Sequence, residues 1–157
     1  MKKMMLILLV AAFTGCKGNA QQETKKEDYP VEKTASQWKA ELTPQEFNVL
    51  RQSGTERAFT SDLLDNKKEG TYTCAACGNP VFEGKHKFDS GTGWPSFDRS
   101  IEGNVSFSSD DKLGYTRVEE HCSNCGSHLG HVFNDGPEQT TGKRHCINGV
   151  ALNFEAN

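Results

Sequence analysis

The sequence lacks an apolar run long enough to span a bilayer as a mature helix. Its longest apolar run, residues 4–13, covers ten residues, whereas a membrane-spanning helix needs about 20. The sequence also lacks an excess of positive charge, because 18 lysines and arginines stand against 21 aspartates and glutamates, for a net charge of −3. An acidic protein has no electrostatic surface suited to nucleic-acid phosphates. We therefore expect neither a membrane-spanning domain nor a nucleic-acid partner.

The composition is that of a folded domain rich in strands. With 157 residues and 34% hydrophobic content, the chain is long enough to form one hydrophobic core of its own. Fifteen glycines, nine phenylalanines and several short alternating runs indicate strands that are joined by many turns. The sequence therefore predicts a single, mainly β domain.

The N-terminus has the pattern of a bacterial export signal. Two lysines precede the apolar run, and Thr14-Gly15-Cys16 follows it directly. This pattern is typical of a lipoprotein signal, in which the cysteine is lipidated. We expect residues 1–15 to be a signal peptide and Cys16 to carry lipid, which would anchor the exported protein to a bacterial membrane with its domain in the periplasm. An uncleaved anchor is the alternative. Without residues 1–15, which hold two lysines and no acid, 16 basic residues stand against 21 acidic ones, for a net charge of −5.

The segment after the signal is polar and has no apolar period. It cannot bury enough surface to become ordered. We therefore expect residues 16–34 to be a flexible, lipid-anchored tether and residues 35–157 to be the folded domain.

A helix start is visible early in the domain. Thr43-Pro44-Gln45-Glu46 has the form of a capping box with proline at the first helical position. It predicts a helix over residues 44–52 that Gly54 closes, preceded by another helix around Trp38.

Two C-x-x-C pairs share the form C-x-x-C-G, Cys74 with Cys77 and Cys122 with Cys125. This spacing lets one hairpin tip offer two sulfurs to a metal, and the glycine permits the positive φ that the tight turn needs. Two such tips would supply the four thiolates of one structural zinc site. Two disulfides in an oxidising compartment are an alternative, and a thioredoxin-like redox pair is another. Neither pair is followed by histidine, which excludes attachment of a c-type haem.

Cys146 has neither a partner within a motif nor a processing role. Arg144, His145 and Asn148 stand around it, in a run that alternates as far as Phe154 in the manner of a half-buried strand. Residues two apart in a strand share a face, so Arg144, Cys146 and Asn148 should point the same way. A nearby cation lowers the pKa of a thiol and favours the nucleophilic thiolate. We expect Cys146 to be a nucleophile, and a buried structural cysteine is the alternative.

Two further stretches carry side chains suited to chemistry. Residues 87–97 alternate glycine with other residues around a Trp-Pro pair, which predicts a loop that exposes Trp94 beside open backbone. Residues 127–137 hold His128 and His131, both candidate proton donors, before a turn. Taken singly, Trp94 would ordinarily be interpreted as a packed side chain, and His128 and His131 as imidazoles that are hydrogen-bonded or exposed.

Together these stretches resemble the B-type methionine-R-sulfoxide reductases. The resemblance rests on FDSGTGWPSF at residues 88–97, SHLGHVFNDGP at 127–137 and RHCIN at 144–148, with the two C-x-x-C-G pairs. It covers about residues 36–156, and the segment 54–59 also looks like the family's. The resemblance implies two antiparallel sheets in a tent-like arrangement, short N-terminal helices, and a tetrathiolate zinc site at the end of the fold away from the nucleophile.

The resemblance also implies roles for individual residues. Cys146 would attack the sulfoxide sulfur while His131, the leading proton donor with His128 beside it, protonates the oxygen, and Cys146 would become a sulfenic acid. Trp94 would receive the S-methyl group of the substrate and so select one sulfoxide hand. Three further positions would orient and polarise this constellation: Arg144, Asn148 and Asp135.

The chain departs from its relatives at three positions. Many relatives have a resolving cysteine where this chain has Thr92. With four cysteines on zinc and Cys16 on lipid, no free thiol remains for an internal disulfide, so we expect an external, thioredoxin-like thiol to reduce the sulfenic acid. Gly149 stands where serine is common, for which we expect a tuning effect only. His145 stands where an aromatic residue is common, and it should face away from the site.

Two other functions are alternatives. An exported zinc-ribbon interaction module with a non-catalytic Cys146 explains the cysteine pairs and the signal, but not the two histidines and the tryptophan loop. A peroxide-reducing cysteine enzyme is a weaker alternative. By the resemblance, the substrates are oxidised proteins and peptides that contain methionine-R-sulfoxide, and we expect the enzyme to be a monomer.

Overall fold

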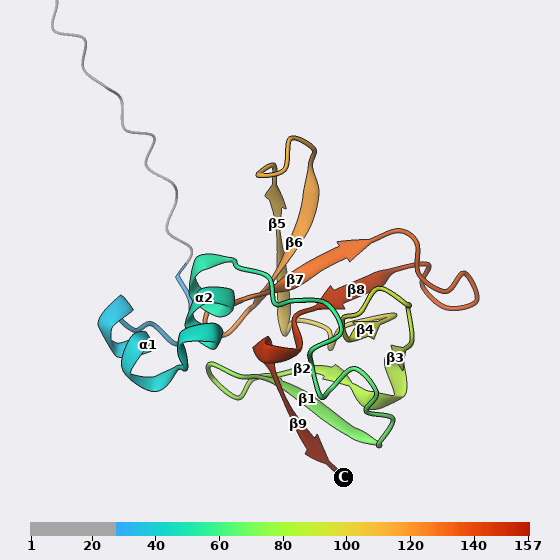
Figure 1. Ribbon diagram of the computed structural model, residues 1–157, viewed down its shortest axis with the longest axis horizontal. Coiled ribbons are helices and arrows are strands. Elements are labelled where there is room, and N and C mark those ends of the chain that lie inside the picture. Colours follow the sequence, from blue (N-terminus) through green and yellow to red (C-terminus); the bar gives the residue numbers. More distant parts are fainter. Residues whose placement is uncertain (1–27) are drawn as a thin grey trace, which may run out of the picture.

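The structure is a computed structural model that describes residues 28–157. The described chain begins with two helices and continues as strands with two short 3-10 helices (Figure 1). The helices are α1 (Ala35–Glu41) and α2 (Pro44–Gln52), and the 3-10 helices are η1 (Gly84–His86) and η2 (Gly149–Ala151). The strands are β1 (Gly70–Cys74), β2 (Pro80–Glu83), β3 (Lys87–Phe88), β4 (Ser96–Phe97), β5 (Val105–Asp110), β6 (Arg117–Cys122), β7 (His128–Phe133), β8 (Arg144–Ile147) and β9 (Leu152–Ala156).

The predicted signal peptide, Cys16 and most of the predicted tether lie outside the described residues. Within residues 28–157, no helix has the length and apolar character needed to cross a membrane. The last residues of the predicted tether contact the domain, because the Val31 amide donates a hydrogen bond to the Asn124 carbonyl over 2.8 Å.

Both helices begin at a threonine that caps them. Thr34 caps α1 and Thr43 caps α2, and each threonine exchanges hydrogen bonds with the residue three positions further on, as a capping box requires. The predictions of a helix over residues 44–52 and of another around Trp38 are therefore confirmed.

Helix α2 ends at Gln52 as predicted, but the left-handed residue that closes it is Ser53 and not Gly54. Ser53, with φ 52°, takes the left-handed conformation that ends the helix. Gly54 is needed for space instead, because a Cβ atom there would lie 2.3 Å from the Asn48 side chain.

The strands form two antiparallel sheets, which confirms the predicted mainly β fold. The smaller sheet has the order β2-β1-β9, and the larger sheet has the order β3-β4-β8-β7-β6-β5. The hairpin formed by β5 and β6 projects from the body of the domain (Figure 1). Helix α2 packs against β7 and η2. In the order of the larger sheet, β8, the strand that carries Cys146, lies between β4 and β7.

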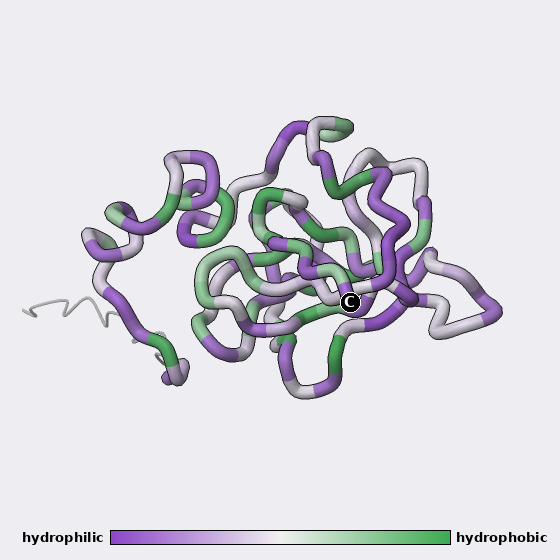
Figure 2. Tube along the Cα trace, turned by 90° about the horizontal axis from the view of Figure 1, so that it is seen from below, coloured by the Kyte–Doolittle hydropathy of each residue, from purple (hydrophilic) through white to green (hydrophobic). Residues whose placement is uncertain are grey.

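Alternation along the strands gives the larger sheet a core face and a second face. On the core face, the Phe97 ring stacks on Phe82 with ring centres 4.4 Å apart and meets Tyr72 edge-on at 5.0 Å. His145 contacts Phe82 on this face at 5.8 Å. Short hydrophobic and hydrophilic stretches follow one another along the trace in Figure 2. Successive residues of a strand point to opposite faces, so the residue next to His145 in β8 points away from the core. Cys146 therefore points to the second face, and the prediction that His145 faces away from it is confirmed.

The C-terminal stretch is not one continuous strand, contrary to the prediction from its alternation. Strand β8 ends at Ile147, η2 follows, and β9 continues in the smaller sheet beside β1. The Glu56 carboxylate accepts hydrogen bonds from the amides of Gly149 and Val150, the latter over 3.0 Å, and so it caps η2. Local alternation could not reveal this cap, because Glu56 lies more than 90 residues away in the sequence.

Candidate active site

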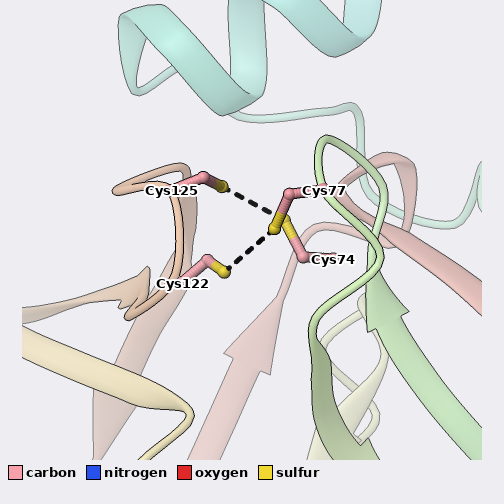
Figure 3. Close-up of side chains that lie close together, drawn as sticks. All are labelled: Cys74, Cys77, Cys122 and Cys125. Atoms are coloured by element: carbon pink, nitrogen blue, oxygen red, sulfur yellow. Dashed lines mark hydrogen bonds between the residues drawn. The ribbon is translucent and has the colours of Figure 1, made fainter. Parts of the chain in front are cut away.

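The four cysteines of the C-x-x-C pairs point toward one another from two turns (Figure 3). Cys74 is the last residue of β1 and Cys77 lies in the turn that follows it, and Cys122 and Cys125 are placed in the same way at the end of β6. All four sulfurs lie within 4.8 Å of one another, and two pairs across the cluster are 3.6 and 3.8 Å apart. Zinc–sulfur bonds of about 2.3 Å in a tetrahedron place the sulfurs about 3.8 Å apart. The cluster could therefore hold a metal ion of this kind.

Two amide side chains stabilise negative charge on these sulfurs. The Asn79 side chain donates to Cys122 Sγ over 3.6 Å, and the Asn124 side chain donates to Cys77 Sγ over 3.5 Å. Such donors favour the thiolate, which is the form that binds a metal. The glycine after each cysteine pair has a positive φ, of 73° and 68°, as predicted.

Cys146 lies within the larger sheet on the face turned away from the core. It is paired with Ser96 of β4 on one side and with His131 of β7 on the other. Its half-buried side chain borders a cavity of about 130 Å³. The residues that line this cavity are Thr55, Trp94, Arg117, Gly130, His131, Phe133, Cys146 and Asn148. The fold thus brings four of the predicted site residues together, and no cysteine of the cluster lines this cavity.

The surroundings of Cys146 disfavour the thiolate. Burial raises the pKa of the Cys146 thiol above its ordinary value, and the nearby Glu120 adds to this rise. The Thr92 hydroxyl, 3.8 Å from the sulfur, and the Arg144 guanidinium both lower the pKa, but by less than burial raises it. Arg144 thus acts in the predicted direction, whereas the predicted net lowering is wrong because desolvation of the sulfur outweighs the cation.

His131 is fixed by a carboxylate that the sequence did not single out. Its Nε2 atom donates to Oδ2 of Asp110 on β5 over 2.8 Å. The Lys112 amide and His131 are the main causes that hold the pKa of Asp110 well below its usual range. Burial lowers the pKa of His131 and the positive charge of Arg117 adds to the shift, although Asp110 opposes both. His131 is therefore mainly neutral near pH 7.

His128 has different surroundings although it lies close to His131. It is buried, and its Nδ1 atom lies 2.6 Å from the Oε1 atom of Glu119. Although burial opposes the shift, this contact lowers the pKa of Glu119 to about 2. The His128 ring meets the His131 ring at a centre-to-centre distance of 5.4 Å and does not line the cavity. Its influence on the cavity passes through His131.

Arg144 is oriented by Asp135, in the loop after β7. The guanidinium donates two hydrogen bonds to the carboxylate, of 2.9 and 2.8 Å, which hold the pKa of Asp135 below its ordinary value. Arg144 also lies over the Phe133 ring, 4.4 Å from its centre. Neither Arg144 nor Asp135 lines the cavity, so they act on it through Phe133 and through the charge near Cys146.

Glu56, which the sequence did not single out for a role, ties several parts of the site together. Its amide donates to the Asn148 side chain over 2.9 Å, and its carbonyl accepts from the Trp94 indole over 3.2 Å. Its carboxylate caps η2, which follows Asn148 directly. The Leu129 carbonyl accepts another hydrogen bond from Asn148, over 3.0 Å. Glu56 therefore positions both Trp94 and Asn148 at the cavity.

Arg117 and Thr55 line the cavity as well, although the sequence did not single them out. Arg117 and Asp110 lie on the β5–β6 hairpin, and β6 pairs with β7. Alternation in that part of the sequence indicates strands but not their register against β7, so no local pattern tied these residues to Cys146. For Thr55, the signal was the likeness of segment 54–59 to the family, which gave a place but no role.

The chain is similar in sequence to known enzymes over most of its length. Residues 42–156 match the family model described as the SelR domain. A peptide methionine sulfoxide reductase MsrB from Methanosarcina barkeri is 55% identical over 126 residues, which cover 80% of this chain and 88% of the relative. A protein of the same name from Leifsonia xyli is 50% identical over 131 residues, which cover 83% of this chain and 94% of that relative. Another from Leptospira interrogans is 50% identical over 129 residues, which cover 82% of this chain and 98% of that relative. The chain therefore belongs to the peptide methionine sulfoxide reductase B family, and it is an oxidoreductase.

Proposed function

We propose that this protein reduces methionine-R-sulfoxide in peptides and proteins to methionine, with Cys146 as the nucleophile. One observation carries the proposal: Cys146 borders a cavity that Trp94 and His131 also line. A thiol, an imidazole and a flat apolar ring are what the reduction of a methyl sulfoxide needs. A cysteine that served packing alone would not need to face such a cavity.

The proposed chemical step balances without an added proton. The Cys146 sulfur attacks the sulfoxide sulfur, and its proton passes through His131 to the sulfoxide oxygen. The oxygen is transferred to the Cys146 sulfur as the substrate's S–O bond breaks, so the substrate is reduced and Cys146 is oxidised to a sulfenic acid. The raised pKa of Cys146 keeps the proton on the resting thiol, and the lowered pKa of His131 keeps the resting imidazole neutral. The thiol brings its own proton, and the neutral imidazole can accept it and pass it on.

Trp94 is proposed to receive the S-methyl group and so to select the sulfoxide hand. Its indole is held by the hydrogen bond to the Glu56 carbonyl, which limits rotation of the ring. With the methyl group against Trp94 and the sulfur near Cys146, only one hand of the sulfoxide directs its oxygen toward His131.

We propose that an external thiol completes the cycle. Among the described residues, every cysteine other than Cys146 belongs to the four-cysteine cluster. Thr92 stands where many relatives have a resolving cysteine, and its hydroxyl lies 3.8 Å from the Cys146 sulfur. One thiol of a thioredoxin-like donor would attack the sulfenic acid and release water, and its second thiol would then release Cys146 by disulfide exchange.

We propose that the cluster binds one structural zinc ion through Cys74, Cys77, Cys122 and Cys125. Closed sets of four thiolates are typical of structural zinc. One pair of ligands lies at the end of β1 in the smaller sheet, and the other lies at the end of β6 in the larger sheet. Zinc would therefore tie the two sheets together and stabilise the fold rather than take part in the chemistry.

We also propose that the protein is exported and lipidated at Cys16, on the basis of its N-terminal sequence. Labelling of cells with palmitate should mark the protein, and Cys16→Ser should remove both the label and the membrane attachment. Membrane attachment that survives in Cys16→Ser would refute the lipid anchor.

Separate assays with the R and S forms of an acetylated methionine sulfoxide peptide test the proposed reaction. With dithiothreitol as reductant, we expect the protein to consume the R form and to leave the S form. Equal use of both forms, or no use of either, would overturn the proposal. Hydrogen peroxide consumption at a comparable rate would favour a peroxide-reducing enzyme instead.

A further inference from the structure

The cavity beside Cys146 contains a permanent cation. Arg117 of β6 lines the cavity together with Trp94, His131 and Cys146. Its side chain is 17% exposed, so the guanidinium is largely withdrawn from water but remains accessible. A cation held at low exposure in a cavity is stabilised only where something negative meets it.

The partners of Arg117 within the described residues leave most of its donors unused. One terminal nitrogen donates to Oδ2 of Asp110 over 2.6 Å, and this is the oxygen that also accepts from His131. The Nε atom is buried and has no acceptor among the described residues. A guanidinium has five N–H donors. A buried donor without an acceptor costs stability, so the ion pair with Asp110 does not by itself satisfy Arg117.

Two other polar side chains that line the cavity, Asn148 and His131, already hold hydrogen-bond partners. The Asn148 side chain accepts from the Glu56 amide and donates to the Leu129 carbonyl. The Nε2 atom of His131 is bound to Asp110. The donors that remain beside the sulfur of Cys146 are the Thr55 hydroxyl, the second N–H of the Asn148 amide and the Arg117 guanidinium, and of these only the guanidinium carries a positive charge.

Resting on the proposed function, we propose that Arg117 binds the oxygen of the substrate sulfoxide. A sulfoxide oxygen carries partial negative charge, and that charge grows as the thiol attacks the sulfur. A fixed guanidinium stabilises such an oxygen more strongly than a neutral donor does. It also fixes the oxygen opposite the Trp94 wall and so contributes to the choice of hand. The reaction product, a thioether, has no oxygen for Arg117 to bind.

This difference between substrate and product supplies the test. In a Cys146→Ser background, which prevents turnover, calorimetric titration gives the affinities for an acetylated methionine-R-sulfoxide peptide and for the matching methionine peptide. We expect Arg117→Gln to weaken binding of the sulfoxide by roughly 10- to 100-fold, as for loss of a hydrogen bond to a charged group. Binding of the methionine peptide should change less than twofold. Equal weakening of both ligands, or no change in either, would overturn the inference.

Two further variants separate oxygen binding from a structural role. Arg99→Gln breaks an exposed ion pair with Asp98 outside the cavity and should change neither affinity. Asp110→Asn removes the carboxylate that Arg117 holds. It should keep a preference for the sulfoxide over the methionine peptide. If Asp110→Asn abolished that preference as fully as Arg117→Gln, Arg117 would act only by holding Asp110, and the inference would fail.

Folding and the proposed function are checked separately. Should Arg117→Gln not fold, as judged by circular dichroism, the same ratio of affinities is measured with Arg117→Lys, which retains a cation for Asp110. We expect this ratio to fall as well, because an ammonium lacks the forked donors of a guanidinium, and an unchanged ratio would overturn the inference. Turnover of the R-sulfoxide by the unaltered protein tests the proposed function, and its result does not depend on the outcome for the Arg117 variants.

Discussion

The clustered cysteines and Cys146 have the same side chain but different neighbours. The clustered sulfurs lie at two turns, within 4.8 Å of one another, and accept hydrogen bonds from amide side chains. The Cys146 sulfur lies within a sheet, with a hydroxyl and a cation near it and a cavity beside it. Four close sulfurs favour a shared metal, whereas one sulfur that faces a cavity favours reaction with a substrate. The surroundings, rather than the residue type, decide what each thiol does.

The two sites are also built over different distances in the sequence. Each half of the cluster comes from a single turn, so the spacing C-x-x-C carries most of its geometry. The site around Cys146 draws on three strands of the larger sheet, on the loop of Trp94 and on the segment of Thr55. Damage to the cluster should therefore affect folding, and damage to the second site should affect chemistry.

Cys146→Ser should show the largest difference between the two sites, with a loss of activity and no effect on the cysteine cluster. The hydroxyl occupies nearly the same space as the thiol but is a far weaker nucleophile, so turnover of the R-sulfoxide should fall by about 1000-fold or more. Metal content and the thermal midpoint should stay unchanged, as measured by mass spectrometry of the metal and by circular dichroism. Activity within tenfold of the unaltered protein would mean that another residue is the nucleophile.

Cys77→Ser should have the opposite effect, on folding first. Binding of structural zinc is worth about 10 kcal/mol or more in zinc-finger peptides, which is comparable to the whole stability of a domain, about 5–15 kcal/mol. We expect the variant to lose both metal and cooperative thermal unfolding, and a strong chelator should do the same to the unaltered protein. A stable and active Cys77→Ser protein without metal would contradict a structural zinc site.

Glu56→Gln should affect both folding and chemistry. The change weakens the acceptor for the two amides of η2, which should lower the free energy of unfolding by about 1–3 kcal/mol. It should also let the Glu56 backbone, which binds Trp94 and Asn148, move more freely. We expect a lower thermal midpoint, an altered Trp94 fluorescence spectrum and a kcat/KM that is about tenfold lower. Glu46→Gln is the matched control, because Glu46 closes a capping box on α2 and does not line the cavity. Equal effects of the two variants on kcat/KM would deny Glu56 a positioning role.

Arg144→Gln should raise the pKa of the Cys146 thiol further. Burial already raises the pKa of this thiol, and Arg144 partly opposes the rise. Loss of the cation removes that opposition, so the thiolate fraction at pH 7.5 falls and alkylation by iodoacetamide should slow by about threefold. Lys143→Gln, at an exposed neighbouring cation, serves as the control. If the pH midpoint of alkylation were lower in Arg144→Gln than in the unaltered protein, Arg144 would raise the pKa of Cys146, which contradicts this prediction.

Thr92→Cys should have the smallest effect on the chemical step while changing how the cycle ends. The Thr92 hydroxyl lies 3.8 Å from the Cys146 sulfur, so a thiol at this position can reach the sulfenic acid after a small shift. Reaction with sulfoxide in the absence of reductant should give an internal disulfide in the variant, detected by mass spectrometry. In the unaltered protein, an internal disulfide involving Cys146 would refute the one-cysteine cycle.

The parts of the fold that were predicted from the sequence are those determined by neighbouring residues. Thr43 and Glu46 stand three apart and form their capping box within one turn of helix. The positive φ at the glycine after each cysteine pair follows from the tight turn in the same way. The left-handed residue that closes α2 was expected at Gly54 and is Ser53, because Gly54 is required by its contact with Asn48 rather than by its dihedral angle.

The sequence by itself determined which residue could be the nucleophile, which four could share a metal, and that Arg144 and Cys146 point away from the face of His145. Each of these depends on spacing and on the two-residue period of a strand. The tertiary structure decided that Cys146 is desolvated enough to raise its pKa, and that Asp110 and Arg117 meet His131 beside it. Desolvation and strand register depend on segments that are distant in the sequence, and no local pattern encodes what will cover a given atom.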